Sequence, residues 1–214
     1  MRPARLLPAV IALGLLIAGC DTGSVPPGGD EAPRLEGEAL IDALADGGLV
    51  IYLRHTATTA PGVDDYATLG DCDAQRELSE EGRRDATEIG EAFASLDIPV
   101  AEVVASPFCR VVETAELAFG ETRTDEALLS LATMEREGDE AYDRVFAAGR
   151  RLIATPPPTG TNVVLVGQFS NLRPITGIGI DEGATAIFRT DGEGDIELVA
   201  QLSPQGWQEL AGTG

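Results

Sequence analysis

The chain has 214 residues, a mass of 22.3 kDa and a formal charge of -21, from 36 acidic and 15 basic residues. This length fits one globular domain, and the strong negative charge disfavours proteins that bind nucleic acids or anionic lipids through basic surfaces. All 15 basic residues are arginine, which excludes reactions that need a lysine, such as Schiff-base catalysis.

Residues 1–19 have the composition of a bacterial export signal. Arg2 and Arg5 precede the apolar stretch Leu6–Ala18, which is too short to cross a hydrocarbon core of about 30 Å as a helix. The run that ends at Cys20 resembles a bacterial lipobox, in which the cysteine is lipidated. We therefore expect a lipoprotein signal peptide over residues 1–19, lipidation of Cys20, and location in the bacterial cell envelope.

Residues 20–34 are rich in glycine, proline and acidic residues and hold hardly any large apolar side chain. Such a segment cannot offset its loss of conformational entropy by burial, so we expect a flexible tether, with membrane contact only through the lipid. Disulfides persist in exported proteins, which favours a bond between Cys72 and Cys109. The alternative is a reactive thiol, but neither cysteine has an arginine six positions later, as a cysteine-based phosphatase loop requires.

Apolar spacing predicts alternating helices and strands along the rest of the chain. A first helix over 36–45 ends at Gly47-Gly48, and Ser79 can cap a helix that runs to Leu96. Continuous apolar runs predict buried strands. The remaining predicted elements are strands 49–53, 101–105 and 162–166, helices 109–119 and 139–154, and a hairpin of 183–188 with 196–202.

This alternation predicts an α/β domain over residues 35–214. We expect a three-layer sandwich with a mostly parallel central sheet, helices on both faces and the hairpin as an antiparallel edge. In such sheets ligands bind beyond the carboxyl ends of the strands. The residues that follow each strand are therefore the candidates for function.

Two arginines and the only histidine of the chain follow predicted strands. Arg54 and His55 come after the first strand, Arg110 comes shortly after the second, and Gln168 follows the third. Guanidinium groups bind phosphate through paired hydrogen bonds and stay charged. The neutral imidazole of His55 could then attack phosphorus as a nucleophile.

The constellation resembles the histidine phosphatase superfamily, which has the phosphoglycerate-mutase-like fold. The resemblance rests on Arg54-His55, the helix start Leu78–Arg83, the segment Ser106–Arg110 with the following Thr114-Ala115, and Val164–Gln168. It implies a phosphohistidine at His55 and chemistry without a metal or another cofactor. The phosphate-binding residues that it implies are Arg54, Arg110, Thr58 and Gln168.

Gln168 stands where the family has its second catalytic histidine. A glutamine keeps an amide donor but cannot carry a proton, and the loss of such a contact costs about a hundredfold or more in rate. The family also needs a carboxylic acid to protonate the leaving oxygen. We expect Glu182 in this role, with Glu135 and Glu137 as alternatives.

Three functions are compatible with the sequence. The first is a metal-independent phosphatase with reduced activity, acting on a small phosphate ester in the cell envelope. The second is a pseudophosphatase that binds a phosphorylated ligand or phosphate anion without turnover. The third is a structural envelope lipoprotein in which the motif has no function.

Overall fold

The computed structural model describes residues 34–59 and 65–213, which belong to one compact unit, Ala32–Gly214. The predicted signal peptide, Cys20 and nearly all of the predicted tether lie outside the described residues. In the described ranges, no helix is both long enough and apolar enough to span a membrane.

Helices and strands alternate along the chain, as the apolar spacing predicts. Their order is α1 (Gly37–Asp46), β1 (Leu49–Arg54), η1 (Tyr66–Thr68), η2 (Cys72–Ala74), α2 (Glu80–Ser95), β2 (Val100–Ala105), α3 (Cys109–Phe119), β3 (Arg123–Thr124), η3 (Glu126–Leu128), α4 (Leu131–Glu137), α5 (Asp139–Ile153), β4 (Asn162–Gly167), α6 (Phe169–Thr176), β5 (Thr185–Thr190), β6 (Ile196–Leu202) and α7 (Pro204–Ala211).

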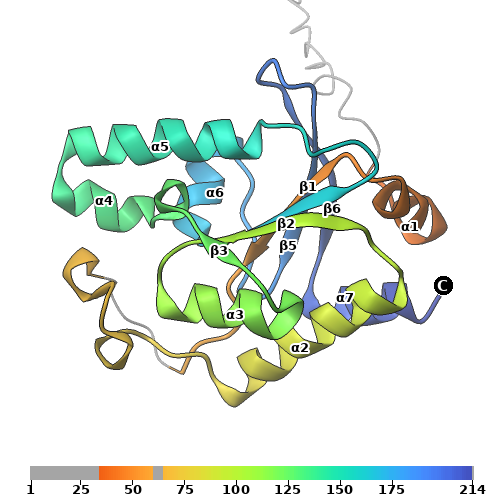
Figure 1. The fold of residues 1–214 in the computed structure, drawn as a ribbon, viewed down its shortest axis with the longest axis horizontal. Coiled ribbons are helices and arrows are strands. Elements are labelled where there is room, and N and C mark those ends of the chain that lie inside the picture. Colours follow the sequence, from red (N-terminus) through yellow and green to blue (C-terminus); the bar gives the residue numbers. More distant parts are fainter. Residues whose placement is uncertain (1–33, 60–64, 214) are drawn as a thin grey trace, which may run out of the picture. The chain divides into compact units, whose positions relative to one another are not determined.

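The strands form one six-stranded sheet in the order β3-β2-β4-β1-β5-β6 (Figure 1). The pairs β3–β2, β2–β4 and β4–β1 are parallel, whereas β5 runs antiparallel to both β1 and β6. The α2, α3 and α7 helices lie on one face, and α4, α5 and α6 lie on the other (Figure 1). The predicted three-layer sandwich with an antiparallel edge hairpin is confirmed.

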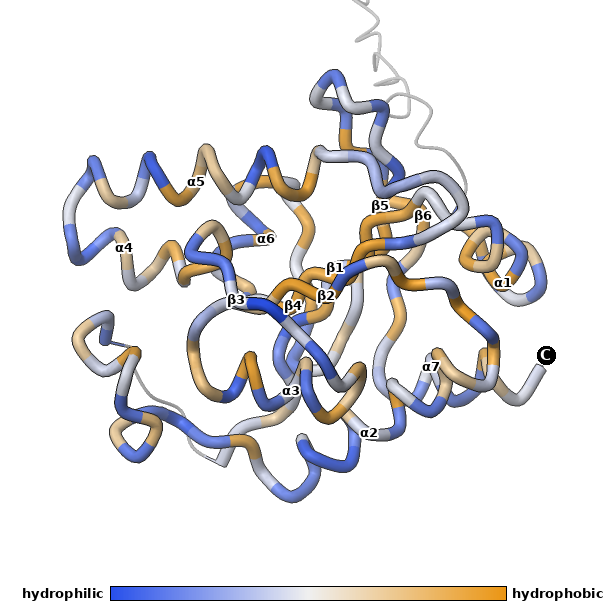
Figure 2. The backbone as a smooth tube through the Cα atoms, in the orientation of Figure 1, coloured by the Kyte–Doolittle hydropathy of each residue, from blue (hydrophilic) through white to orange (hydrophobic). Residues whose placement is uncertain are grey.

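The central strand β1 is buried on both faces. Ile51 and Leu53 belong to the core cluster that also holds Trp207 of α7, while Tyr52 packs in the second cluster with Leu172 of α6. Figure 2 shows the central strands coloured mostly as hydrophobic, whereas hydrophilic and hydrophobic residues alternate along the surrounding helices. Burial of both faces explains why the strand sequence is apolar throughout instead of alternating.

Several boundaries follow from local chemistry. The Ser79 side chain accepts from the N–H of Gly82 and caps α2, as predicted. The first hairpin strand begins at Thr185, later than predicted, because Gly183 adopts a φ of 74° and its N–H donates to the carbonyl of His55 at 3.0 Å. The sequence pattern did not indicate β3, α4, α6 or α7. These elements are short, and α6 carries Pro174 inside it.

Candidate active site

Three segments meet at the carboxyl ends of β1, β2 and β4, and we call them the strand-end rim: Arg54–Thr56, Ser106–Arg110 and Gly167-Gln168. Backbone hydrogen bonds continue the sheet ladder into them. The N–H of His55 donates to the carbonyl of Gly167 at 3.0 Å, and the N–H of Ser106 donates to that of Val166 at 3.0 Å. The sheet therefore brings the predicted residues Arg54, His55, Arg110 and Gln168 to one edge, as the parallel topology requires.

His55 is only 1% exposed and its ring is oriented by the backbone. Its Nδ1 lies 2.9 Å from the carbonyl oxygen of Thr56; since a carbonyl only accepts, Nδ1 carries the proton and Nε2 keeps its lone pair. Burial, followed by repulsion from Arg110, Arg54 and Arg76, lowers the pKa of His55 to about 3. The imidazole is therefore neutral at ordinary pH, the form in which it is a nucleophile.

The loop that carries His55 is held by residues of the sequence motifs. The Thr56 N–H donates to Oγ1 of Thr114 at 3.2 Å, and that hydroxyl donates to the Arg110 carbonyl at 2.7 Å. On the other side, a Cβ on Gly82 would lie 2.1 Å from the Ala57 carbonyl oxygen, so only glycine fits there. These contacts explain the spacing of the motifs: both α2 and α3 pack directly on the His55 loop.

The two predicted arginines are held differently. Arg110 is fully buried in the first turn of α3, with its guanidinium 5.0 Å from the centre of the Phe108 ring. Arg54 donates from Nη1 to the Ile180 carbonyl at 3.0 Å and stacks on Phe169 at 5.7 Å. Burial lowers the pKa of Arg54, opposed by Glu182 and Asp181, yet a guanidinium remains charged in proteins.

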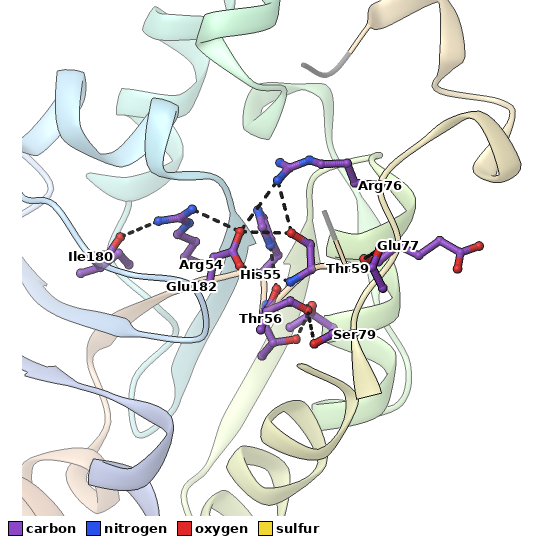
Figure 3. Close-up of polar contacts among 12 residues, drawn as sticks. Arg54, His55, Thr56, Thr59, Arg76, Glu77, Ser79, Ile180 and Glu182 are labelled. Carbon is purple, nitrogen blue, oxygen red and sulfur yellow. Dashed lines mark hydrogen bonds and ion pairs between the residues drawn. The ribbon is translucent and has the colours of Figure 1, made fainter. Parts of the chain in front are cut away.

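Glu182 lies among donors of the site (Figure 3). Its Oε2 accepts from the Thr58 N–H at 3.2 Å, and its Oε1 accepts from the Thr58 hydroxyl and from Nη2 of Arg54, each at 3.4 Å. The structure thus places Glu182 and Thr58 together with Arg54. Glu135 and Glu137, the alternative acids, are exposed near the end of α4.

Gln168 is 4% exposed and is fixed from both sides. Its carbonyl accepts from the Tyr52 hydroxyl at 2.9 Å, and its Nε2 lies 3.1 Å from Oγ of Ser106. Within the described residues, the buried Oε1 of Gln168 and Nε of Arg54 have no hydrogen-bond partner. A serine hydroxyl can donate as well as accept, so the side-chain amide of Gln168 can also adopt the flipped orientation. In that orientation its Oε1 accepts from the Ser106 hydroxyl and its NH₂ group is available to an anion.

A third arginine, Arg76, was not predicted. Its Nη1 donates to the Thr58 hydroxyl at 3.3 Å and lies 3.9 Å from Oε1 of Glu182, opposite Arg54 (Figure 3). Arg76 follows no strand, so the rule that directs attention to strand ends misses it. The available signal was its place two residues before the motif that begins at Leu78.

A pocket of about 320 Å³ adjoins the rim, and Arg76, Arg110 and both half-cystines line it. The predicted disulfide between Cys72 and Cys109 is confirmed, with their Cα atoms 5.7 Å apart. A second pocket of about 360 Å³ lies beside Arg54 and Phe169. Three cationic side chains therefore surround His55 and border two recesses, an arrangement suited to a tetrahedral anion with an organic group attached.

The family model of the histidine phosphatase superfamily (branch 1) matches residues 50–141. These residues include His55, Arg76 and Arg110. They do not include Gln168 or Glu182, so the correspondence of these two with family positions stays a prediction. No curated protein is significantly similar to the chain.

Solved structures share the fold at low identity. The protein histidine phosphatase SixA complexed with tungstate is 16% identical over 73% of this chain and 97% of its own, with a TM-score of 0.50. A putative phosphohistidine phosphatase SixA from Nakamurella multipartitia is 18% identical over 73% and 96%, also at 0.50. The ecdysone phosphate phosphatase of Bombix mori, complexed with tungstate, is 15% identical over 72% and 92%, again at 0.50.

Proposed function

Because this chain belongs to the histidine phosphatase superfamily, we propose that it hydrolyses a small phosphate monoester through a phosphohistidine at His55. One observation carries the proposal. The His55 ring is neutral, its Nδ1 proton is held by the Thr56 carbonyl, and three guanidinium groups lie close enough to lower its pKa. A bare Nε2 beside positive charge is what attack on a phosphate dianion needs.

The reaction proceeds in two displacements. The lone pair of His55 Nε2 forms a P–N bond as the P–O bond to the alcohol breaks, and the departing oxygen takes a proton. Water then attacks phosphorus and gives a proton to the carboxylate left by the group that protonated the alcohol oxygen, while the P–N bond breaks, its electron pair returns to His55 Nε2 and inorganic phosphate leaves. Arg54, Arg76 and Arg110 stabilise the charge on the equatorial oxygens in both steps.

Glu182 is the carboxyl group that we propose to protonate the departing oxygen. In the structure it accepts from Thr58 and Arg54, donors that an arriving phosphate group would engage. Phosphate binding would thereby free the carboxyl group from these contacts and leave it at the edge of the site, beside the leaving group. The Thr58 N–H and hydroxyl are then phosphate donors.

We propose a small substrate that is reached after export. A chain with a charge of -21 repels polyanions at long range, whereas a single phosphate group is attracted locally by the arginines. The related proteins that carry tungstate, a tetrahedral dianion, support a ligand of this shape. Cys20, as the lipidated residue, would hold the enzyme in the cell envelope.

The test is turnover of p-nitrophenyl phosphate by the purified protein, followed by detection of the phosphoryl-enzyme after rapid denaturation. We expect hydrolysis and a phosphoryl label that is lost in acid and stable in alkali, the behaviour of a phosphoramidate. In the His55→Asn variant both should be absent, while orthophosphate still binds. Turnover that survives in His55→Asn would contradict the proposal.

The second candidate function is that of a pseudophosphatase, which binds a phosphorylated ligand without turnover. The neutral amide of Gln168 favours this candidate. This side chain can offer a hydrogen bond but no proton to the transferring group. If Gln168 limits the chemistry, Gln168→His raises kcat roughly a hundredfold. An unmodified protein that binds orthophosphate without turnover, with activity only in Gln168→His, would establish the pseudophosphatase. Equal turnover by both proteins would exclude Gln168 as the limiting residue.

A further inference from the structure

The chain between the His55 loop and α2 contains a poorly packed stretch, Asp65–Glu77, which we call the Arg76 segment. All of its residues are described and none is buried; Leu69 and a few others are half-buried. It contains only the short turns η1 and η2. Hydrophobic burial therefore does little to fix its position.

Two ties attach the Arg76 segment to the first residue of α3. The disulfide joins Cys72 to Cys109. Gln75 then spans the gap between the two parts of the chain: its Oε1 accepts from the Cys109 N–H at 2.9 Å, while its Nε2 donates to the Thr68 carbonyl at 2.8 Å. A covalent bond and a bidentate amide thus converge on a single residue of the rim.

Both ends of this connection carry an arginine of the site. Arg76 follows Gln75 directly, and its guanidinium reaches Thr58 and Glu182. Arg110 follows Cys109 directly and is fully buried. The connection therefore fixes an arginine on a loosely packed segment relative to an arginine on a rigid helix.

Given the function proposed above, we propose that the disulfide and Gln75 form a clamp that positions Arg76 for phosphate binding, so that phosphate affinity depends on the intact disulfide. A dithiol reductant opens the clamp. It supplies two electrons and two protons, which convert the disulfide into the thiols of Cys72 and Cys109, and is itself oxidised to a disulfide. Cys72 is exposed, so the reductant can reach the bond.

The alternative is a disulfide that only stabilises the folded domain by restricting the unfolded chain. The two roles predict different coupling between the disulfide and Arg76 in their effects on phosphate affinity. A clamp that acts through Arg76 has no effect on phosphate affinity once Arg76 is gone, whereas general stabilisation acts independently of Arg76. A double-mutant cycle measures this coupling directly.

The experiment measures orthophosphate affinity by calorimetry, at a temperature where circular dichroism shows each protein folded. We expect Arg76→Ala to weaken binding about tenfold, in keeping with one charged hydrogen bond at a half-buried site. The Cys72→Ser/Cys109→Ser variant, and unmodified protein treated with dithiol, should lose about fivefold. In the Arg76→Ala background, opening the disulfide should change affinity less than about twofold.

Controls separate the clamp from other effects. Arg84→Ala removes the same charge from an exposed position of α2 and should leave affinity within about twofold. Dithiol should not change the Cys72→Ser/Cys109→Ser variant, which excludes an effect through Cys20. Gln75→Ala should weaken orthophosphate binding, as reduction of the disulfide does.

Two outcomes overturn the inference. One is an affinity unchanged by reduction, and the other is a loss on reduction that is equally large in Arg76→Ala. Either would leave the proposed function intact, since the unmodified protein would still bind and turn over phosphate compounds. If the unmodified oxidised protein binds no orthophosphate and hydrolyses no ester, the proposed function fails, and the inference fails with it.

Discussion

The strand-end rim and the Arg76 segment supply the same chemical group to one site, but the fold holds them in different ways. His55 and Arg110 of the rim are 1% and 0% exposed and sit on elements whose backbones are paired in the sheet or packed on it. The Arg76 segment has no buried residue and is held by a disulfide and a small number of hydrogen bonds. These include the contacts of Gln75 with Cys109, of Arg76 with Thr58, and of the Glu77 carbonyl with Thr59.

Residues of the site are therefore positioned in two ways, by close packing in the rim and by a few specific contacts in the Arg76 segment. Buried rim residues such as His55 and Arg110 can move only if the core is repacked, because interiors are close-packed. The Arg76 segment can move at the cost of a few specific contacts, as poorly packed loops do. The rim should therefore be sensitive to changes in packing, and the segment to changes in its ties. Three predictions test this comparison.

The largest effect is expected at Arg110. Its removal should weaken orthophosphate binding at least about a hundredfold, because a buried guanidinium offers paired charge-assisted donors. This is about ten times the loss expected for Arg76→Ala. Calorimetry on Arg110→Ala and Arg76→Ala measures the ratio, and Arg110→Lys, which keeps the charge, serves if the alanine variant does not fold. Equal losses at Arg76 and Arg110 would break the comparison.

Glycine-to-alanine changes probe packing in the two regions. In Gly82→Ala the new Cβ would lie 2.1 Å from the Ala57 carbonyl oxygen, whereas a Cβ on Gly70 meets nothing within 4 Å. We expect Gly82→Ala to cost about 1–3 kcal/mol of unfolding free energy, as overpacking does, and Gly70→Ala to stay within about 0.5 kcal/mol. Thermal unfolding of both variants is the measurement, and a Gly70→Ala variant as unstable as Gly82→Ala would contradict it.

The smallest effect concerns the acid stability of the rim. Burial and the nearby arginines lower the pKa of His55 to about 3 from 6.5, so between these values the unfolded chain binds a proton that the folded protein does not. Stability therefore falls as pH falls through this window. For His55 alone the loss between pH 6.5 and 5.5 is about 1 kcal/mol.

Denaturant unfolding of the unmodified protein and of His55→Asn at these two pH values isolates the contribution of His55. The loss on acidification should be about 1 kcal/mol smaller in His55→Asn. An identical pH dependence in the two proteins would show that His55 titrates normally in the folded state. In that case the electrostatic description of the rim would be wrong.

Much of the fold was predictable because each long element carries its own signal. The apolar run at β1 and the Ser79 cap of α2 are local features, and both appear in the structure. The helices α6 and α7 were missed. Ser203 does cap α7, with Pro204 in its first turn, but eight residues are too few for a clear apolar period.

Some features of the site could likewise be predicted from the sequence, and others could not. Arg54, His55, Arg110 and Gln168 could be expected together because the carboxyl ends of parallel strands meet at one sheet edge. The disulfide partners could be named because Cys72 and Cys109 are the only cysteines in the predicted folded domain. Glu182 was named as the acid, but its contacts with Thr58 and Arg54 depend on how the chain enters β5.

By itself, the sequence determined the order of the strands and helices and which residues follow each strand, since propensity, apolar period and capping are properties of neighbouring residues. Only the tertiary structure decided that Arg76 joins the site and that His55 is held neutral with Nδ1 protonated. Both depend on burial and on contacts between residues far apart in the chain. Such contacts exist only once the sheet, the helices and the disulfide have brought those residues together.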